Sequence, residues 1–210
     1  MRTWDHNETM TFLEATSEDR LYALYLLTIH TGLREGEVLG LRWQDIDLER
    51  GVLSVRQTVV RIGAKIAIGQ PKSKNSYRTV ALSNTVVQAL KSHRRIILSE
   101  QLQAGSRYES NDLVFPTTLG TLMNPSNLRR EFIKAKKKAN VPDIRFHDLR
   151  HTSATLMLAG GVHPKVVSER LGHHTASFTL DKYSHVLPNM QEEASNTLDQ
   201  MLRKKKQKEG

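Results

Sequence analysis

The segment His147-Asp148-Leu149-Arg150-His151-Thr152 begins a stretch that the sequence pattern predicts to be helical as far as Ala159, where Gly160-Gly161 ends it. On such a helix His147 and Arg150 lie three residues apart and share a face. The apolar positions point elsewhere, so this imidazole and this guanidinium can face a cleft. A His-x-x-Arg pair alone is common on solvated surfaces, and its meaning depends on its surroundings. The expected core face consists of Leu149, Ser153, Leu156 and Met157.

Other segments supply groups that complement this pair. Downstream, Leu171-Gly172-His173 and then Tyr183 add an imidazole and a phenol. Upstream, Thr31-Gly32-Leu33-Arg34-Glu35-Gly36-Glu37 contains a second arginine, followed three residues later by a carboxylate that can orient it. Two guanidinium groups, histidines and a hydroxyl nucleophile are what is needed to hold a phosphodiester and attack its phosphorus. The residues therefore indicate cutting and rejoining of DNA.

Composition agrees with a nucleic-acid partner. The chain has 210 residues, a formal net charge of +9 and an isoelectric point near 9.9, and a phosphate backbone is the commonest partner for such an excess. The absence of cysteine excludes disulfides, zinc–thiolate sites and thiol nucleophiles. The longest apolar run, near 24–29, is far shorter than the roughly 20 residues that cross a bilayer, and no secretory signal is evident. A soluble protein of a reducing compartment is expected.

The predicted fold class is α+β and mainly α, with a small three-stranded antiparallel sheet at one edge. Alternating residues from Val52 to Val60, Lys65–Ile68 and Arg78–Leu82 are typical of its strands. The polar turn Pro71-Lys72-Ser73-Lys74-Asn75-Ser76 joins the last two. Helices are expected after a cap at Ser17 as far as Gly32, from Glu35, from Ser83 to Ala104, from Asn124, from His147 to Ala159, from His163 to Leu171, around Phe178 to Tyr183, and from about Asn189 onward.

Taken in order, the segments resemble the catalytic domain of the tyrosine recombinase family, in particular the integrases of phages and conjugative transposons. They are Thr31–Glu37, Pro71–Lys74, His147–Thr152, Leu171–His174 and Tyr183–His185. The resemblance spans about residues 7–188. It implies a catalytic domain over 1–188, and a C-terminal helix and basic tail over 189–210 that can dock on a neighbouring protomer.

The resemblance also implies roles for individual residues. Arg34 corresponds to the first catalytic arginine, with Glu37 as the acidic residue that supports it. The lysine of the β-hairpin falls on Lys74, with Lys72 as the alternative because hairpin turns vary in length. The remaining catalytic positions are His147, Arg150, His173 and the nucleophile Tyr183.

These roles imply a mechanism. A phenol has an unperturbed pKa of about 10, so Tyr183 must lose its proton as it attacks, and His147 is the candidate acceptor. Arg34, Arg150 and His173 would hold the non-bridging oxygens where charge accumulates. Lys74 would protonate the leaving 5′ hydroxyl. The resulting 3′-phosphotyrosine link preserves the energy of the broken bond, so no ATP, metal or other cofactor is implied.

The expected partners are double-stranded DNA attachment sites, other protomers in a tetramer on synapsed DNA, and accessory DNA-bending proteins. No membrane is involved, and the expected location is the bacterial cytoplasm, in association with the nucleoid. Family members usually carry an N-terminal domain that clamps DNA. Because this chain begins only about thirty residues before Arg34, it resembles a catalytic fragment.

Several alternatives remain open at this point. The same chemistry would suit a type IB topoisomerase, while a DNA-binding module without catalysis and a metal-dependent nuclease are further rivals. The basic face of Lys134, Lys136, Lys137 and Lys138, after Arg129-Arg130, either contacts phosphates or is solvated. His151, His174 and His185 are expected to form hydrogen bonds to site residues. The tyrosines weighed against Tyr183 are Tyr22, Tyr25, Tyr77 and Tyr108.

Overall fold

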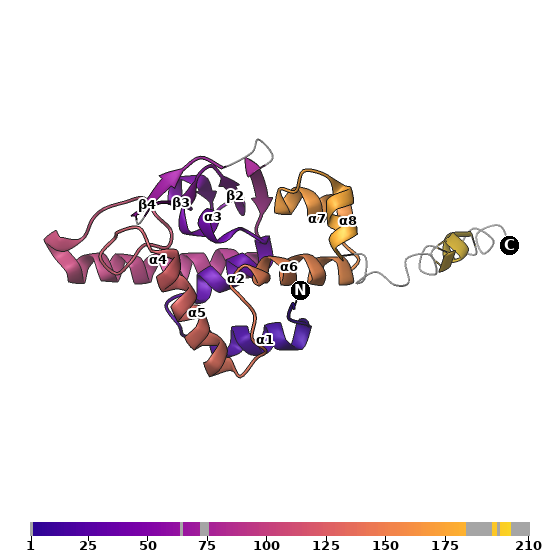
Figure 1. Cartoon of the computed structure of the whole chain (residues 1–210), viewed down its shortest axis with the longest axis horizontal. Helices are drawn as coiled ribbons and strands as arrows, with labels where there is room; N and C mark the ends of the chain where they lie inside the picture. The colour runs from indigo at the N-terminus through magenta and orange to yellow at the C-terminus, as the bar shows by residue number, and fades with distance from the viewer. Residues whose placement is uncertain (1, 64, 72–75, 184–194, 197, 203–210) are drawn as a thin grey trace.

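The computed structural model describes residues 2–63, 65–71, 76–183, 195–196 and 198–202. Helices make up most of it, and the small β region lies at one edge, above α4 (Asn84–Ala104) and beside α7 (Pro164–Leu171) in the view of Figure 1. This mainly helical α+β architecture confirms the predicted fold class. The helices are α1 (His6–Ala15), α2 (Tyr22–Thr31), α3 (Glu35–Leu39), α4 (Asn84–Ala104), α5 (Pro125–Ala139), α6 (Asp148–Ala159), α7 (Pro164–Leu171) and α8 (Ala176–Tyr183), with short 3-10 turns η1 (Trp43–Asp45) and η3 (Gly105–Arg107).

Most helix boundaries follow from local capping chemistry. Ser83 caps α4 through its hydroxyl, and Asn124 caps α5, whose first residue is a proline. Gly32 ends α2 in the left-handed conformation with φ 64°, as predicted. The predicted cap at Ser17 is wrong, because α2 begins only at Tyr22, after a series of turns. Helix α1, with its capping box at Asp5, was not predicted.

The β region differs in pairing from the prediction. The strands are β1 (Ile46–Asp47), β2 (Val52–Val55), β3 (Thr58–Ile62), β4 (Lys65–Gly69) and β5 (Arg78–Ala81). A three-stranded antiparallel sheet has the order β1-β2-β5, while β3 and β4 form a separate hairpin. The predicted pairing of 65–68 with 78–82 is therefore wrong. The chain leaves the sheet at Arg56-Gln57, where the Gln57 side chain donates to the Gly40 carbonyl at 2.8 Å, so the strand after it starts a new ladder.

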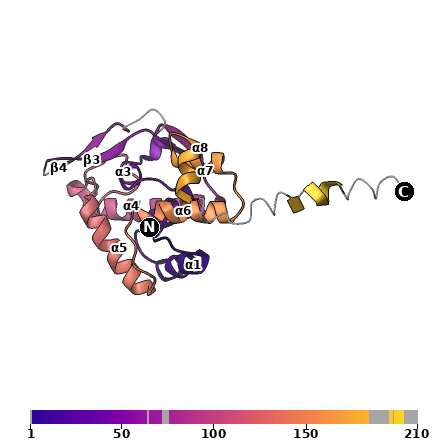
Figure 2. The same cartoon turned by 45° about the vertical axis from the view of Figure 1, so that its right-hand side comes forward.

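An aromatic cluster in the main core joins α1, α2 and α5. Phe12 lies between Trp4 at 4.7 Å, Tyr25 at 5.2 Å and Phe132 at 5.6 Å between ring centroids, and all four side chains are buried. The Trp4 backbone N–H donates to the Thr152 hydroxyl at 3.1 Å, which ties the N-terminal segment to α6. Turning the molecule shows α1 and α5 on the same side of α6 (Figure 2). The core thus fixes the helix that carries His147 and Arg150.

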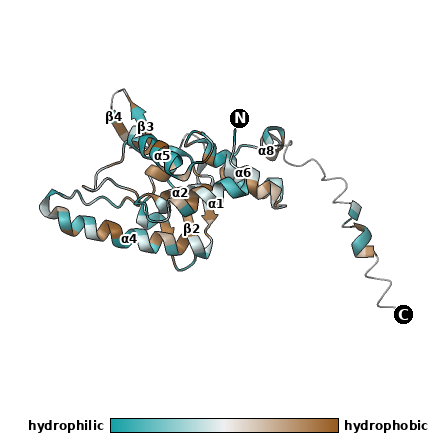
Figure 3. Cartoon of the chain, turned by 90° about the horizontal axis from the view of Figure 1, so that it is seen from below, coloured by the Kyte–Doolittle hydropathy of each residue, from teal (hydrophilic) through white to brown (hydrophobic). Residues whose placement is uncertain are grey.

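A second, smaller cluster joins α6, α7 and α8. These helices stand together beside the sheet (Figure 1), and apolar and polar residues are interspersed along α4 (Figure 3). Within the part of the chain that the structure describes, no helix is long and apolar enough to cross a membrane. Residues 195–196 and 198–202 are helical, with Leu198, Met201 and Leu202 exposed. The buried members of the second cluster are Ala154, Leu158, Val167, Leu171 and Tyr183.

Candidate active site

Three successive carbonyl oxygens at the C-terminal end of α7 each accept a hydrogen bond from a different arginine. The pairs are Arg78 Nε with the oxygen of Arg170 at 2.6 Å, Arg150 Nη2 with that of Leu171 at 2.6 Å, and Arg34 Nη2 with that of Gly172 at 3.4 Å. The last carbonyls of a helix lack intrahelical partners and carry partial negative charge. This turn therefore gathers cationic side chains from β5, α6 and the start of α3 at one place.

Arg34 is held by Glu37, as the sequence spacing suggested. Arg34 Nη1 donates to Glu37 Oε1 at 2.7 Å, and the Arg34 backbone N–H donates to Oε2 at 3.0 Å. Burial alone would raise the pKa of Glu37, but hydrogen bonds and charge from Arg78 and Arg34 outweigh it, and the pKa is lowered. The Arg34 side chain is 38% exposed and that of Glu37 only 3%. The Arg34 guanidinium can thus contact an anion while the Glu37 carboxylate that orients it stays buried.

Arg150 is buried, with only 3% of its surface exposed. Its Nη1 donates to the Gly32 carbonyl at 2.6 Å, in addition to the bond from Nη2 to Leu171. Burial, and next the charge of Arg34, lower the pKa of Arg150 to about 9. Two guanidinium groups that repel one another would each be stabilised by a shared anion, so this arrangement favours phosphate binding.

His173 lies immediately after the turn that gathers the arginines. Its Nδ1 is 2.8 Å from the Thr179 hydroxyl on α8. Burial, followed by the charges of Arg150 and Arg34, lowers the pKa of His173 to about 3. The imidazole is therefore neutral at physiological pH and can donate one N–H bond. It also lines a pocket of about 410 Å³ together with Arg78 and Lys165.

Tyr183 is fully buried at the end of α8, and its hydroxyl lies 2.6 Å from Nδ1 of His151. Burial raises the pKa of Tyr183 to about 12, although Arg150 opposes this. Burial, and then Lys182 and His147, lower the pKa of His151 to about 4. A neutral imidazole next to a protonated phenol implies that Tyr183 donates and His151 accepts. The expectation that His151 bonds to a site residue agrees with this contact.

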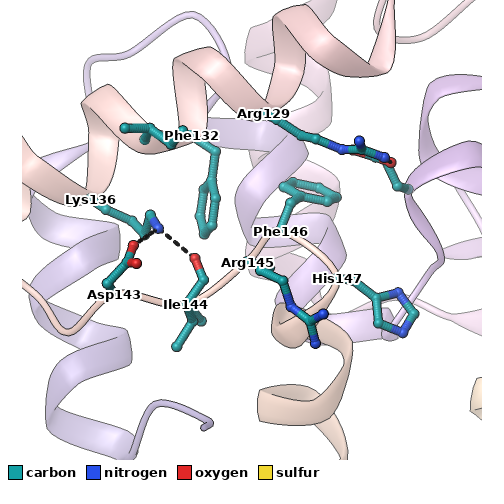
Figure 4. Close-up of a pocket in the computed structure, with 10 residues that line it drawn as sticks. Arg129, Phe132, Lys136, Asp143, Ile144, Arg145, Phe146 and His147 are labelled. Carbon is teal, nitrogen blue, oxygen red and sulfur yellow. Dashed lines mark hydrogen bonds and ion pairs between the residues drawn. The ribbon is translucent and has the colours of Figure 1, made fainter. Parts of the chain in front are cut away.

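His147 does not share this hydrogen bond. Its ring is edge-on to that of His151, with centroids 5.1 Å apart, and burial followed by the charge of Arg150 lowers the pKa of His147. His147 lines a pocket of about 490 Å³ with Arg145, Phe146 and Arg129 (Figure 4). Arg34 and Glu37 line a different pocket of about 290 Å³. Of the predicted site residues, Arg34, Arg150 and His173 thus meet at one turn, Tyr183 bonds instead to His151, and Arg34, His147 and His173 line three different pockets.

The sequence predicted two further sets of cationic residues, the lysines of the hairpin turn and those of α5. Lys72 and Lys74, the candidates for the hairpin lysine, lie outside the described residues. On α5, Lys136 does not belong to an exposed basic face. Its side chain is buried and donates to Asp143 and to the Ile144 carbonyl (Figure 4). Helical periodicity turns this position toward the following loop, whereas Lys134 remains exposed.

Comparison with known proteins identifies the family. The model of the Phage integrase family matches residues 2–190, so the chain belongs to that family. The resemblance to the tyrosine recombinases is thereby confirmed. A relative described as tyrosine recombinase XerC-like, from Caldanaerobacter subterraneus subsp. tengcongensis, is 39% identical over 96% of this chain and 55% of its own length. The ICEBs1 integrase of Bacillus subtilis is 29% identical, again over 96% of this chain and 55% of its own length.

Solved structures show the same fold. The XerA recombinase superposes with a TM-score of 0.74 at 25% identity, covering 92% of this chain and 65% of its own. The Tn1549 transposon integrase in complex with circular intermediate DNA gives a TM-score of 0.77 at 22% identity, covering 94% and 67%. This chain spans about half the length of the curated relatives it matches. Their names are those of recombinases and integrases, so the topoisomerase alternative is not favoured.

Proposed function

We propose that this chain is the catalytic part of a site-specific DNA recombinase that cuts and rejoins strands through a 3′-phosphotyrosine link, for the integration or excision of a mobile element. The observation that carries the proposal is the meeting of Arg34, Arg150 and His173 at one turn, beside a helix that ends in Tyr183. Family membership supports the same chemistry.

The arginines and His173 would stabilise the charge that develops during attack. Arg34, whose side chain is 38% exposed, would bind a non-bridging phosphate oxygen, and the buried Arg150 would supply a second positive charge. The neutral imidazole of His173 would add one hydrogen bond. Donors fixed before the substrate arrives need no reorganisation during the reaction, which is where such groups contribute most.

Tyr183 would be the nucleophile, and its burial sets a condition on the reaction. A fully buried phenol with a pKa of about 12 cannot attack a phosphate outside the protein. We infer that DNA binding moves α8 so that the hydroxyl leaves His151 and approaches the arginines. His147 remains the proposed acceptor of the Tyr183 proton. Its ring already lies edge-on to that of His151, the present partner of the Tyr183 hydroxyl. Lys74, or Lys72, would protonate the leaving 5′ oxygen.

The proposed partners are double-stranded attachment sites, which is supported by solved structures of the Tn1549 transposon integrase in complex with transposon right end DNA and of the XerH recombinase bound to a palindromic difH substrate. A tetramer on synapsed DNA, accessory DNA-bending proteins and docking of 189–210 on a neighbouring protomer are further parts of the proposal. The activity would take place in the cytoplasm, at the bacterial nucleoid.

The test is to trap the covalent adduct. The protein is incubated at low salt with a pool of nicked duplexes of random sequence. Cleavage near the nick releases a short strand that carries the 5′ hydroxyl, and its loss prevents rejoining. We expect an adduct that survives denaturation and contains Tyr183. Tyr183→Phe should bind DNA but form none, whereas Tyr108→Phe, the matched control, should form it normally. EDTA should have no effect. An adduct with the Tyr183→Phe protein would remove Tyr183 from the role.

A further inference from the structure

Arg78 has its guanidinium in contact with three separate segments. Nη2 and Nη1 donate to the two carboxylate oxygens of Glu37 at 2.8 and 3.2 Å, Nη1 also donates to the Ser76 carbonyl at 3.1 Å, and Nε donates to that of Arg170 at 2.6 Å. The side chain is only 7% exposed. A group so enclosed has little room to bind DNA itself, yet it bonds directly to the partner of Arg34.

The contacts of Glu37 show what Arg78 controls. Each carboxylate oxygen accepts one hydrogen bond from Arg34 and one from Arg78. The carboxylate is therefore fully occupied, and it cannot turn to bind both Nη atoms of Arg34 in a fork, the geometry that a free arginine–carboxylate pair prefers. Two arginines and one glutamate also leave one formal positive charge. Without Arg78, the charges of Arg34 and Glu37 would cancel.

We propose that Arg78 is a positioning residue for strand cleavage, which holds Glu37 so that the partly exposed Arg34 side chain keeps a full positive charge for the phosphate. Its bond to the Arg170 carbonyl serves the same end, because the next two carbonyls hold Arg150 and Arg34. Arg78 thereby joins β5 and α3 to the turn that precedes His173. The inference rests on the proposed function of this site.

The experiment compares Arg78→Gln, Arg78→Lys and the double variant Arg78→Gln/Glu37→Gln. Single-turnover adduct formation is measured with excess protein on a nicked duplex recovered from the random pool, and duplex affinity is measured by fluorescence anisotropy. We expect Arg78→Gln to cleave roughly 10- to 100-fold more slowly, with affinity changed by less than about threefold. Arg78→Lys keeps the charge next to Glu37 and should recover most of the rate.

The double variant separates positioning from a merely structural role. It removes more native contacts than Arg78→Gln, so a structural role predicts a rate that is equal or lower. Positioning predicts the opposite. The double variant should cleave at least about fivefold faster than Arg78→Gln, because the Glu37 carboxylate, whose charge Arg78 no longer balances, is gone. Arg20→Gln is the control, since Arg20 makes a comparable fork with Glu100 and a bond to the Pro116 carbonyl. A wild-type rate for Arg78→Gln, or no gain in the double variant, would overturn the inference.

Phosphate binding can be measured without any cleavage, by the shift in Tm that it causes. Inorganic phosphate should raise the Tm of the wild-type protein more than that of Arg78→Gln, and the double variant should regain the lost part. If wild-type protein forms no adduct, the proposed function fails, while this titration still tests Arg78. Equal phosphate-induced shifts in all three proteins would contradict the positioning role.

Discussion

Arg34, Arg78 and Arg150, which form the arginine side of the site, each donate to a backbone carbonyl of the turn that ends α7. Tyr183 and His151, which form the tyrosine side, depend on one hydrogen bond between two side chains and on a small apolar cluster. The arginine side is tied to the main core through α2, α3, β5 and α6. On the tyrosine side, His151 lies on α6, whereas Tyr183 lies on α8 and packs in the small apolar cluster that joins α6, α7 and α8.

This difference matches the separate demands of the proposed reaction. Charge stabilisation works best when the donors are already fixed, because no energy is then lost in orienting them. Tyr183, the proposed nucleophile, is buried and has a pKa of about 12, so it would be protected and unreactive until it moves. We therefore regard the arginine side as prepared in the absence of DNA, and the tyrosine side as the part that DNA must rearrange.

Arg150→Lys should produce the largest effect, because it removes a two-pronged donor from the arginine side. A lysine keeps the charge but cannot bond to the Gly32 and Leu171 carbonyls with the same fork. We expect adduct formation to fall by about 10²- to 10³-fold, with weaker effects on DNA affinity. Single-turnover cleavage measures this. Arg42→Lys, at an arginine paired with Asp45 away from the site, is the control.

Gly32→Ala should come next, because it disturbs the arginine side through the backbone. Gly32 has φ 64°, and an added Cβ would lie 2.2 Å from Leu171 Cδ2. The strained backbone and the clash together should lower the free energy of unfolding by about 2 to 4 kcal/mol, as measured by urea denaturation. Gly161→Ala is a matched control, with φ 77° and nothing within 4 Å of the added atom. Equal losses in the two variants would show that contact with Leu171 does not matter.

His151→Phe should have a smaller effect, confined to the tyrosine side. It leaves the buried Tyr183 hydroxyl without its acceptor, which should cost about 1 to 3 kcal/mol of stability. His151→Asn places an oxygen near the position of Nδ1 and should lose less. The losses of stability in the two variants are compared by thermal unfolding. If asparagine and phenylalanine were equally destabilising, the hydrogen bond at 2.6 Å would not be what holds Tyr183.

The sequence predicted more of the arginine side than of the tyrosine side. Gly32 as a helix end and Glu37 as the partner of Arg34 follow from local spacing, and both are found. Strand pairing could not be predicted, since alternation alone does not say which strand β5 joins. Arg78 was overlooked because its partners are distant in sequence. The bond of Tyr183 to His151, one helical turn after His147, depends on how α8 packs on α6, which no local pattern encodes.

A change of pH should give the smallest effect and should distinguish the two sides. The pKa of His151 is lowered from 6.5 to about 4 in the folded protein, with Lys182, His147, Asp148 and Arg150 as its charged neighbours. Below pH 6.5 the unfolded chain takes up a proton that the folded protein does not, so stability declines as the pH falls toward about 4. Wild-type protein should lose several degrees of Tm between pH 7.5 and 5. His151→Asn, which cannot titrate, should lose fewer. A parallel decline in both would assign the acid sensitivity to other groups, with His173 the first to examine.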